Sequence, residues 1–226
     1  MKRLKKAGPC PDPAHYIWVR RRNGGYWRLK RGSLKPAVLN EVFAANAKNT
    51  RQTMPAAKRL LDRLKPYLDK FHKDYRLQRV ATLFSRDLKK TGEMGYGQFA
   101  GFEMQRNYPL EQIYEGSPEI SISRKVMEVT IDLKKKPVLR KSNVSFHYYF
   151  ELILVSGDPA KEKALRVESD CSTLYEFGRE YTDKIQLNLQ LPEKKPYVVF
   201  LKCGCMERYS PASHPKNYGM KVVGVG

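Results

Sequence analysis

Arginine, lysine and aromatic side chains are concentrated in one short stretch near the start of the chain, from Tyr16 to Lys35. Guanidinium and ammonium groups neutralise phosphates, and exposed Trp or Tyr rings stack on unpaired bases. This combination predicts a surface that binds a polyanion or a partner subunit. The candidate binding residues are Trp18, Arg20, Arg21, Arg22, Tyr26, Trp27, Arg28, Lys30 and Arg31.

The same stretch is expected to form a β-hairpin that presents these side chains. Asn23, Gly24 and Gly25 tolerate the positive φ that a tight turn requires. Because a hairpin of this size is only marginally stable by itself, it should lie against the body of the protein or against a partner. In an alternative interpretation, Trp18 and Trp27 pair with each other across the hairpin and pack on the helices, which would leave them unavailable for bases.

Other kinds of chemistry find less support in the sequence. Cys203 and Cys205 lack the usual C-x2–4-C spacing of a zinc site, although Cys171 and His214 could approach them, so we expect buried thiols and neither a metal nor a cofactor. The four histidines are scattered, and no nucleophile elbow accompanies them. We therefore expect that the protein is not an enzyme. An enzyme that uses residues 93–119 as its active-site cleft is a third hypothesis.

The positive charge is uneven along the chain. Residues 1–110 hold 25 Lys and Arg against 8 Asp and Glu, a formal charge of +17, whereas the whole chain carries +20. Such an excess favours contact with nucleic acid, an anionic lipid surface or an acidic protein face, and solvated helix faces are the alternative explanation. With no secretion signal and no apolar run long enough for a bilayer, we expect a cytoplasmic protein without a membrane partner.

Residues 36–92 predict a three-helix region. Apolar side chains recur at helical spacing after Pro36, again from Pro55, where Pro66 interrupts or kinks the helix, and again from Tyr75 to a stop at Gly92. A helix-turn-helix that reads DNA is an alternative, but these helices lack its typical turn glycine.

The remaining residues predict a connector followed by strands. Residues 93–119 are rich in Gly and aromatic residues and are expected to wrap one layer onto another. From 120 to 226 the apolar period changes to two, which predicts six or seven strands in an antiparallel immunoglobulin-like sandwich, with a closed barrel as the alternative. The predicted fold is therefore α+β: a basic arm and hairpin (1–35), helices (36–92), the connector (93–119) and the sandwich (120–226).

Four segments carry a resemblance to other proteins: KPAVLNEVFAANA, PAAKRLLDRLKPYL, GFEMQRNYPLEQI and YVVFLKC. With them, the chain resembles uncharacterised bacterial proteins, found mainly in Bacteroidota, that join a basic helical N-terminal part to an immunoglobulin-like sandwich. The resemblance implies this architecture, a bacterial or phage-like setting and a structural or assembly role. It assigns no functional residue.

Together these features predict a non-enzymatic structural protein of a virion-like or injection-type particle. Its basic N-terminal half would dock on a polyanionic or acidic partner, and its partners would be the other protein subunits of the assembly. The alternative is a stand-alone nucleic-acid-binding protein that holds DNA or RNA with the Arg-rich aromatic hairpin. Under the first hypothesis the protein resides in the cytoplasm or in a particle assembled there.

Overall fold

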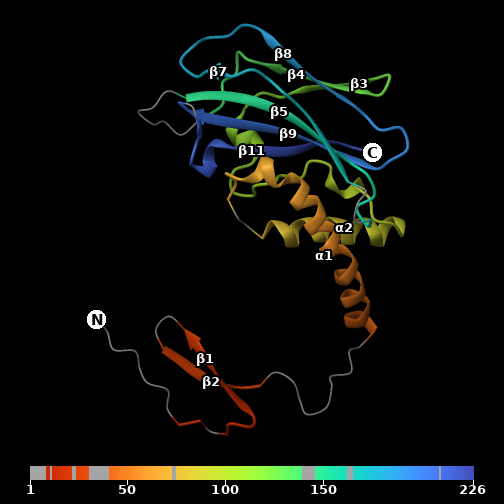
Figure 1. The fold of residues 1–226 in the computed structure, drawn as a ribbon, viewed down its shortest axis with the longest axis vertical. Helices are drawn as coiled ribbons and strands as arrows, with labels where there is room; N and C mark the ends of the chain where they lie inside the picture. Colours follow the sequence, from red (N-terminus) through yellow and green to blue (C-terminus); the bar gives the residue numbers. More distant parts are fainter. Residues whose placement is uncertain are drawn as a thin grey trace. The chain divides into compact units, whose positions relative to one another are not determined.

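A computed structural model describes residues 9–10, 12–21, 24–30, 41–72, 75–138, 146–161, 165–208 and 210–226 (Figure 1). The chain divides into two compact units, Met1–Asn46 and Ala47–Gly226. The first unit contains the hairpin of β1 (Tyr16–Arg21) and β2 (Gly24–Leu29). The second contains most of the helical residues and both larger sheets.

The hairpin has the predicted strands, but two of the residues predicted for its turn lie in a strand. β1 and β2 pair antiparallel from Tyr16↔Leu29 to Arg21↔Gly24, so Gly24 and Gly25 belong to β2 and not to the turn that we predicted at residues 23–25. Packing explains the glycine at position 25, because a Cβ there would lie 2.5 Å from the nearest ring atom of Trp18. Gly25 thus makes room for an indole ring.

Helix α1 (Glu41–Leu68) is one continuous helix of 28 residues where two separate helices were predicted. Pro55 and Pro66 both lie inside it, although each proline removes a hydrogen bond of the helix. From residue 53 onward the helix buries a stripe with a spacing of three to four residues, and this packing offsets the missing bonds. The buried residues are Thr53, Ala56, Ala57, Leu60, Leu64 and Leu68.

Helix α2 (Arg76–Thr91) ends where the sequence predicted. Gly92 has a φ of 81°, and its N–H donates to the carbonyl oxygen of Leu88 at 3.0 Å. Glycine adopts this left-handed conformation without steric cost. Within 41–72 and 75–91, the described part of this region, the structure therefore shows two helices where we predicted three. A single-turn helix, α3 (Leu110–Ile113), follows later.

Two antiparallel sheets form the sandwich. The first has the order β3-β4-β8, and the second β6-β5-β9-β11. Lettered A, B, C, C′, E, F and G along the chain, these seven strands are arranged as A-B-E and C′-C-F-G, as in immunoglobulin-type domains. The predicted α+β fold is confirmed, with two separate sheets rather than a closed barrel. The strands are β3 (Glu119–Ser123), β4 (Val126–Asp132), β5 (Phe146–Ser156), β6 (Arg166–Cys171), β8 (Lys184–Gln190), β9 (Tyr197–Glu207) and β11 (Gly219–Val225); the short strands β7 (Tyr175–Glu176) and β10 (Ser210–Pro211) extend the second sheet.

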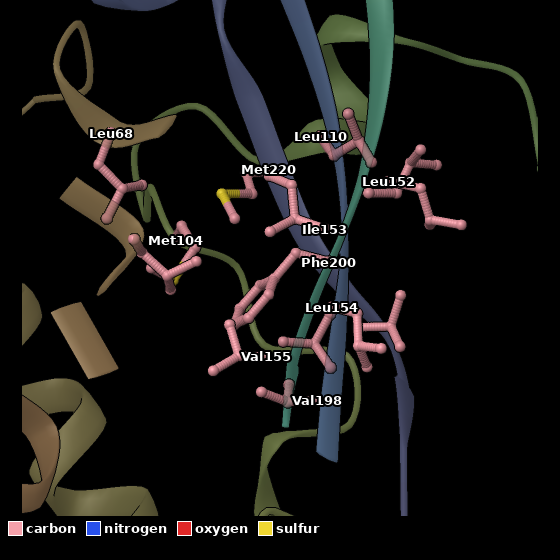
Figure 2. Close-up of a cluster of buried hydrophobic side chains, with 14 of the residues drawn as sticks. Leu68, Met104, Leu110, Leu152, Ile153, Leu154, Val155, Val198, Phe200 and Met220 are labelled. Atoms are coloured by element: carbon pink, nitrogen blue, oxygen red, sulfur yellow. The ribbon is translucent and has the colours of Figure 1, made fainter. Parts of the chain in front are cut away.

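The second sheet is buried on both faces, so the helices and the sandwich share one hydrophobic core. Ile153 points with Phe200 toward Leu68 of α1, whereas the neighbouring Leu152 and Leu154 point to the opposite side (Figure 2). The β3-β4-β8 sheet covers that opposite side, and the helices cover the first (Figure 1). Because both faces are covered, residues 152–155 are all buried and do not alternate with polar residues.

Residues 93–118 contribute to the core of the unit Ala47–Gly226. Phe99 packs against Phe84 of α2 with ring centroids 4.9 Å apart. The next residues hydrogen-bond along β11, where the N–H of Met104 donates to the carbonyl of Met220 at 2.8 Å. The boundaries predicted at residues 92 and 119 therefore fall inside the unit Ala47–Gly226.

Candidate polyanion-binding site

Only part of the predicted binding surface in the hairpin is presented as expected. Trp18 and Trp27 are cross-strand partners whose ring centroids lie 5.2 Å apart with an interplanar angle of 64°. The two indoles therefore pair with each other, as one part of the alternative interpretation predicted, and each ring offers less surface to a base. Arg22 and Arg31 lie outside the described residues, and only backbone is described for Arg20 and Arg21.

The opposite face of the hairpin carries the other predicted aromatic residue. Tyr26 and Arg28 are two positions apart in β2 and therefore lie on the same face, and the Tyr26 side chain is 41% exposed. The Nε of Arg28 is buried and has no hydrogen-bond partner among the described residues. Lys30 instead folds back on the preceding segment, where its Nζ donates to the carbonyl of Pro13 at 3.0 Å.

A second basic surface, which we did not predict, lies in the unit Ala47–Gly226. It is an open groove of about 1050 Å³ between α1, the end of α2, the β5–β6 loop and the β8–β9 loop. Six cationic and two anionic side chains line it, which leaves a formal charge of +4. The charged residues of this basic groove are Arg51, Arg59, Lys161, Arg166, Lys194 and Lys195, with Glu93 and Asp158.

Most of the cations in the basic groove are available to a ligand. Within the described part of the chain, no carboxylate lies within ion-pair distance of Arg51, Arg166, Lys194 or Lys195, whereas Lys161 lies 3.4 Å from Asp158. None of the residues that line the groove is aromatic. The groove is therefore suited to phosphates or carboxylates and offers no ring on which a base could stack.

Arg59 holds one wall of the basic groove in place. From α1, its Nε and Nη2 donate to the carbonyl of Pro159 at 3.2 and 3.1 Å, and Nη2 also donates to the carbonyl of Ala160 at 2.9 Å. A guanidinium presents several donors in a fixed plane, which suits two successive carbonyls. These bonds tie the β5–β6 loop to the helix, so Arg59 is a positioning residue.

The two loops of the basic groove are also joined to each other. The N–H of Gly157 donates to the carbonyl of Pro196 at 2.8 Å, and the hydroxyl of Tyr96 donates to the carbonyl of Gly157 at 3.3 Å. Burial, with a smaller contribution from the charge of Asp158, raises the pKa of the Tyr96 phenol, which therefore stays a donor. Such bonds fix the loops that present Lys161 and Lys195, and a preorganised surface loses less entropy on binding.

Sequence reasoning missed the basic groove because its residues come from four distant segments. Lys194 and Lys195 look like ordinary residues of a polar turn between strands, and Arg51 looks like one of many solvated helix cations. No local spacing indicates that they meet. The available signal was the density of Lys and Arg, which indicated a polyanion but pointed to the N-terminal half, whereas four of the six groove cations, Lys161, Arg166, Lys194 and Lys195, lie in the second half of the chain.

The cysteines of the second sheet lie on two different faces. Cys203 and Cys205 are fully buried on the face of β9 that points to the β3-β4-β8 sheet, whereas strand alternation directs Cys171 to the opposite face of its sheet. Burial raises the pKa of the Cys205 thiol to about 12 and that of Cys203 further, which keeps both protonated. Within the described ranges, no three His, Cys, Asp or Glu side chains gather as metal ligands.

A buried ion pair lies on the helix-facing side of the second sheet. Lys202 Nζ and Glu151 Oε2 are 2.9 Å apart, and their side chains are only 8% and 13% exposed. Burial alone would lower the pKa of Lys202, but Tyr149 and Glu151 outweigh it and raise that pKa. The Lys202 ammonium is therefore kept inside the core, where it pairs with Glu151.

No protein-family model, curated protein or solved structure matches this chain. The resemblance to proteins of Bacteroidota therefore stays a prediction. Among the described helices, none has the length and apolar character needed to cross a membrane.

Proposed function

We propose that this protein is a non-enzymatic assembly subunit that docks on a polyanionic partner through its basic groove. The observation that carries the proposal is the set of four cations without a carboxylate partner in the described structure, held around one groove by hydrogen-bonded loops. Its place would be a virion-like or injection-type particle assembled in the cytoplasm, as the sequence predicted.

The chemistry of the groove supports contact with a charged backbone rather than a reaction. Its two carboxylates are outnumbered by cations, and Asp158 already accepts the N–H of Ala160 at 2.8 Å. Lys and Arg neutralise phosphates and release counterions irrespective of sequence, so binding of this kind weakens as salt rises. A subunit that joins a polyanion to other copies needs such contacts and a rigid body, and the sandwich supplies the latter.

A salt titration of the full-length protein against duplex DNA and against polyglutamate tests the proposal, with light scattering on the same samples. We expect the logarithm of the affinity to fall linearly with the logarithm of the salt concentration, and discrete oligomers to form on the polyanion. The variant Lys194→Ala/Lys195→Ala should lower the slope for duplex DNA by about two.

A matched control is the variant Lys134→Ala/Lys135→Ala. These two lysines are also adjacent and exposed, but they follow β4 and do not line the basic groove. Both variants lose two positive charges, so a difference in their polyanion affinity shows that the location of the lysines matters. An equal loss of affinity in the two variants, or binding that does not respond to salt, would show that the groove is not the site.

The alternative, a stand-alone nucleic-acid-binding protein, draws support from the exposed ring of Tyr26 beside Arg28 on one face of β2. That arrangement could place a base on the ring and a phosphate on the guanidinium. The variant Tyr26→Ala/Arg28→Ala should then abolish binding of single-stranded DNA while the groove variant binds it normally. The assembly subunit is favoured if the groove variant loses binding while the hairpin variant binds and self-associates normally.

A further inference from the structure

The strand β3 (Glu119–Ser123) has an open edge. One edge pairs with β4, from Glu119↔Thr130 to Ser123↔Val126, and no backbone group among the described residues pairs with the other. Natural edge strands are usually protected by lysine, proline or a bulge, and residues 119–123 contain none of these. The edge is therefore a template for another strand.

The turn that follows β3 determines which backbone groups point outward. Arg124 and Lys125 form a two-residue turn with φ values of 47° and 70°, as in the turns that join tight hairpins. In such a hairpin the pair next to the turn, Ser123↔Val126, is hydrogen-bonded, and bonding then alternates along the strand. The N–H and C=O groups of Ile120 and Ile122 consequently point to the open edge.

The side chains of the same two residues form an exposed apolar strip. Ile120 is 43% and Ile122 is 58% exposed, and both lie on the face that carries the buried Met127 of β4. A hollow of about 330 Å³ adjoins Ile120 and is lined mostly by apolar residues of the β11 and α3 regions. Among the described residues, the outward-pointing backbone groups and the exposed side chains of Ile120 and Ile122 are thus both left without a partner.

We propose that a second copy of this chain occupies the edge, with the two β3 strands antiparallel about a two-fold axis at Ser121. Ile120 of each copy then lies opposite Ile122 of the other, which pairs their outward-pointing backbone groups and joins four isoleucines in one strip. The charges at the two ends of the strand are also opposite, because Glu119 opens it and Arg124 follows it. Within each copy, Glu119 also pairs with Lys184 and Lys125 pairs with Glu193. An antiparallel pair of identical strands brings each acidic end to the basic end of its neighbour.

The first experiment measures self-association by sedimentation velocity on the full chain of 26.2 kDa, without any polyanion and at moderate salt. A contact between two five-residue strands is small, so we expect a dimer that forms with rising concentration. Ile122→Lys should raise the dimer dissociation constant by at least about tenfold, and Leu174→Lys, which replaces another exposed hydrophobic residue (53% exposed), should not change it. If the wild-type protein stays monomeric at all concentrations, the proposal is wrong. The edge would then be a site for a strand of a different protein.

A proline variant separates strand pairing from simple apolar contact. Ile122→Pro removes an N–H that points to the open edge and leaves the ladder with β4 intact. It should abolish the dimer while retaining the thermal midpoint of the wild type. A dimer of unchanged strength in Ile122→Pro contradicts pairing through the strand edges; if this variant does not fold, Ile122→Lys decides.

Cross-linking tests the position of the two-fold axis. Non-hydrogen-bonded partners in an antiparallel pair have Cα atoms about 4.5 Å apart, which a disulfide can span. Ser121→Cys should therefore oxidise to a covalent dimer. Ser123→Cys, on the same face of β3, lies opposite Glu119 of the second copy and should cross-link no more than the wild-type protein. Equal cross-linking of the two variants overturns the proposed register. Because these experiments contain no polyanion, they succeed or fail independently of the basic groove.

Discussion

The guanidinium of Arg59 hydrogen-bonds the carbonyl of Pro159, a residue one hundred positions further along the chain, at 3.1 Å. This contact joins α1 to the β5–β6 loop and so sets the distance between two walls of the basic groove. The groove therefore forms only when the helix packs on the sandwich. Its stability should depend on the shape of the Arg59 side chain as well as on its charge.

Arg59→Lys tests that dependence because it keeps the charge. Lysine has no planar group that can reach the carbonyls of Pro159 and Ala160 together, so we expect a loss of about 1–2 kcal/mol in the free energy of unfolding. Polyanion affinity should also fall, since the loop loses its anchor. Urea denaturation and a binding titration measure the two effects. The control Arg63→Lys, an exposed position on the same helix, should change neither; an equal response there would rule out a positioning role.

The buried pair of Glu151 and Lys202 predicts a large loss from a single substitution. Glu151→Leu leaves the Lys202 ammonium without its carboxylate in a site where that side chain is only 8% exposed. Removing one partner of a buried pair costs about 3–5 kcal/mol. The double variant Glu151→Leu/Lys202→Met removes both charges and should be clearly more stable than the single variant in chemical denaturation. Additive losses would show that the two charges do not interact.

Glu103 should make stability depend on pH near neutrality. Burial raises its pKa from 4.5 to about 7, although the N–H of Leu110, which donates to its Oε2 at 3.0 Å, opposes this shift. Because the folded state holds the proton more tightly, the contribution of this group falls as pH rises from about 4.5 to about 7. Glu103→Gln should flatten the dependence of the thermal midpoint on pH over that range, since its amide oxygen still accepts from Leu110.

Glu111→Gln provides a control of opposite sign for the Glu103 variant. The side chain of Lys221 hydrogen-bonds the exposed Glu111 and lowers its pKa. The stabilisation from Glu111 is therefore present above the unfolded pKa and lost as pH falls. This variant should lower stability at neutral pH and change little in acid. The interpretation of Glu103 fails if its variant shows the same pH profile as Glu111→Gln.

Gly25→Ala should disrupt the hairpin through the pair of tryptophans. Its Cβ would lie 2.5 Å from the nearest ring atom of Trp18, so the indole must move away from Trp27. The expected result is loss of the exciton signal of paired indoles in the far-ultraviolet circular dichroism spectrum. Gly178→Ala is the matched control because no atom lies within 4 Å of the added Cβ. An unchanged exciton signal in Gly25→Ala would show that the strands carry the hairpin without this packing.

Several local features could be predicted from the sequence. The alternation from Ile185 to Leu191 predicted a half-buried strand, and the run before Gly92 predicted a helix that ends there, because both depend on neighbours a few residues away. The separate helices around Pro55 were predicted wrongly. A proline inside a helix is locally destabilising, so the sequence predicts a break there. In α1 the packing of the buried stripe against residues far away in the chain offsets this loss.

The sequence by itself determined the positive charge, the amphipathic periods and the class of fold, since each follows from residue types at fixed spacing. Only the tertiary structure decided that the helices and the sandwich share one core, and that Arg51, Arg166 and Lys195 meet around one groove. It also decided that one edge of β3 pairs with no strand in the described part of the chain. These relationships join residues far apart in the chain, and their energies arise from packing and hydrogen bonds that form only when the distant segments come together.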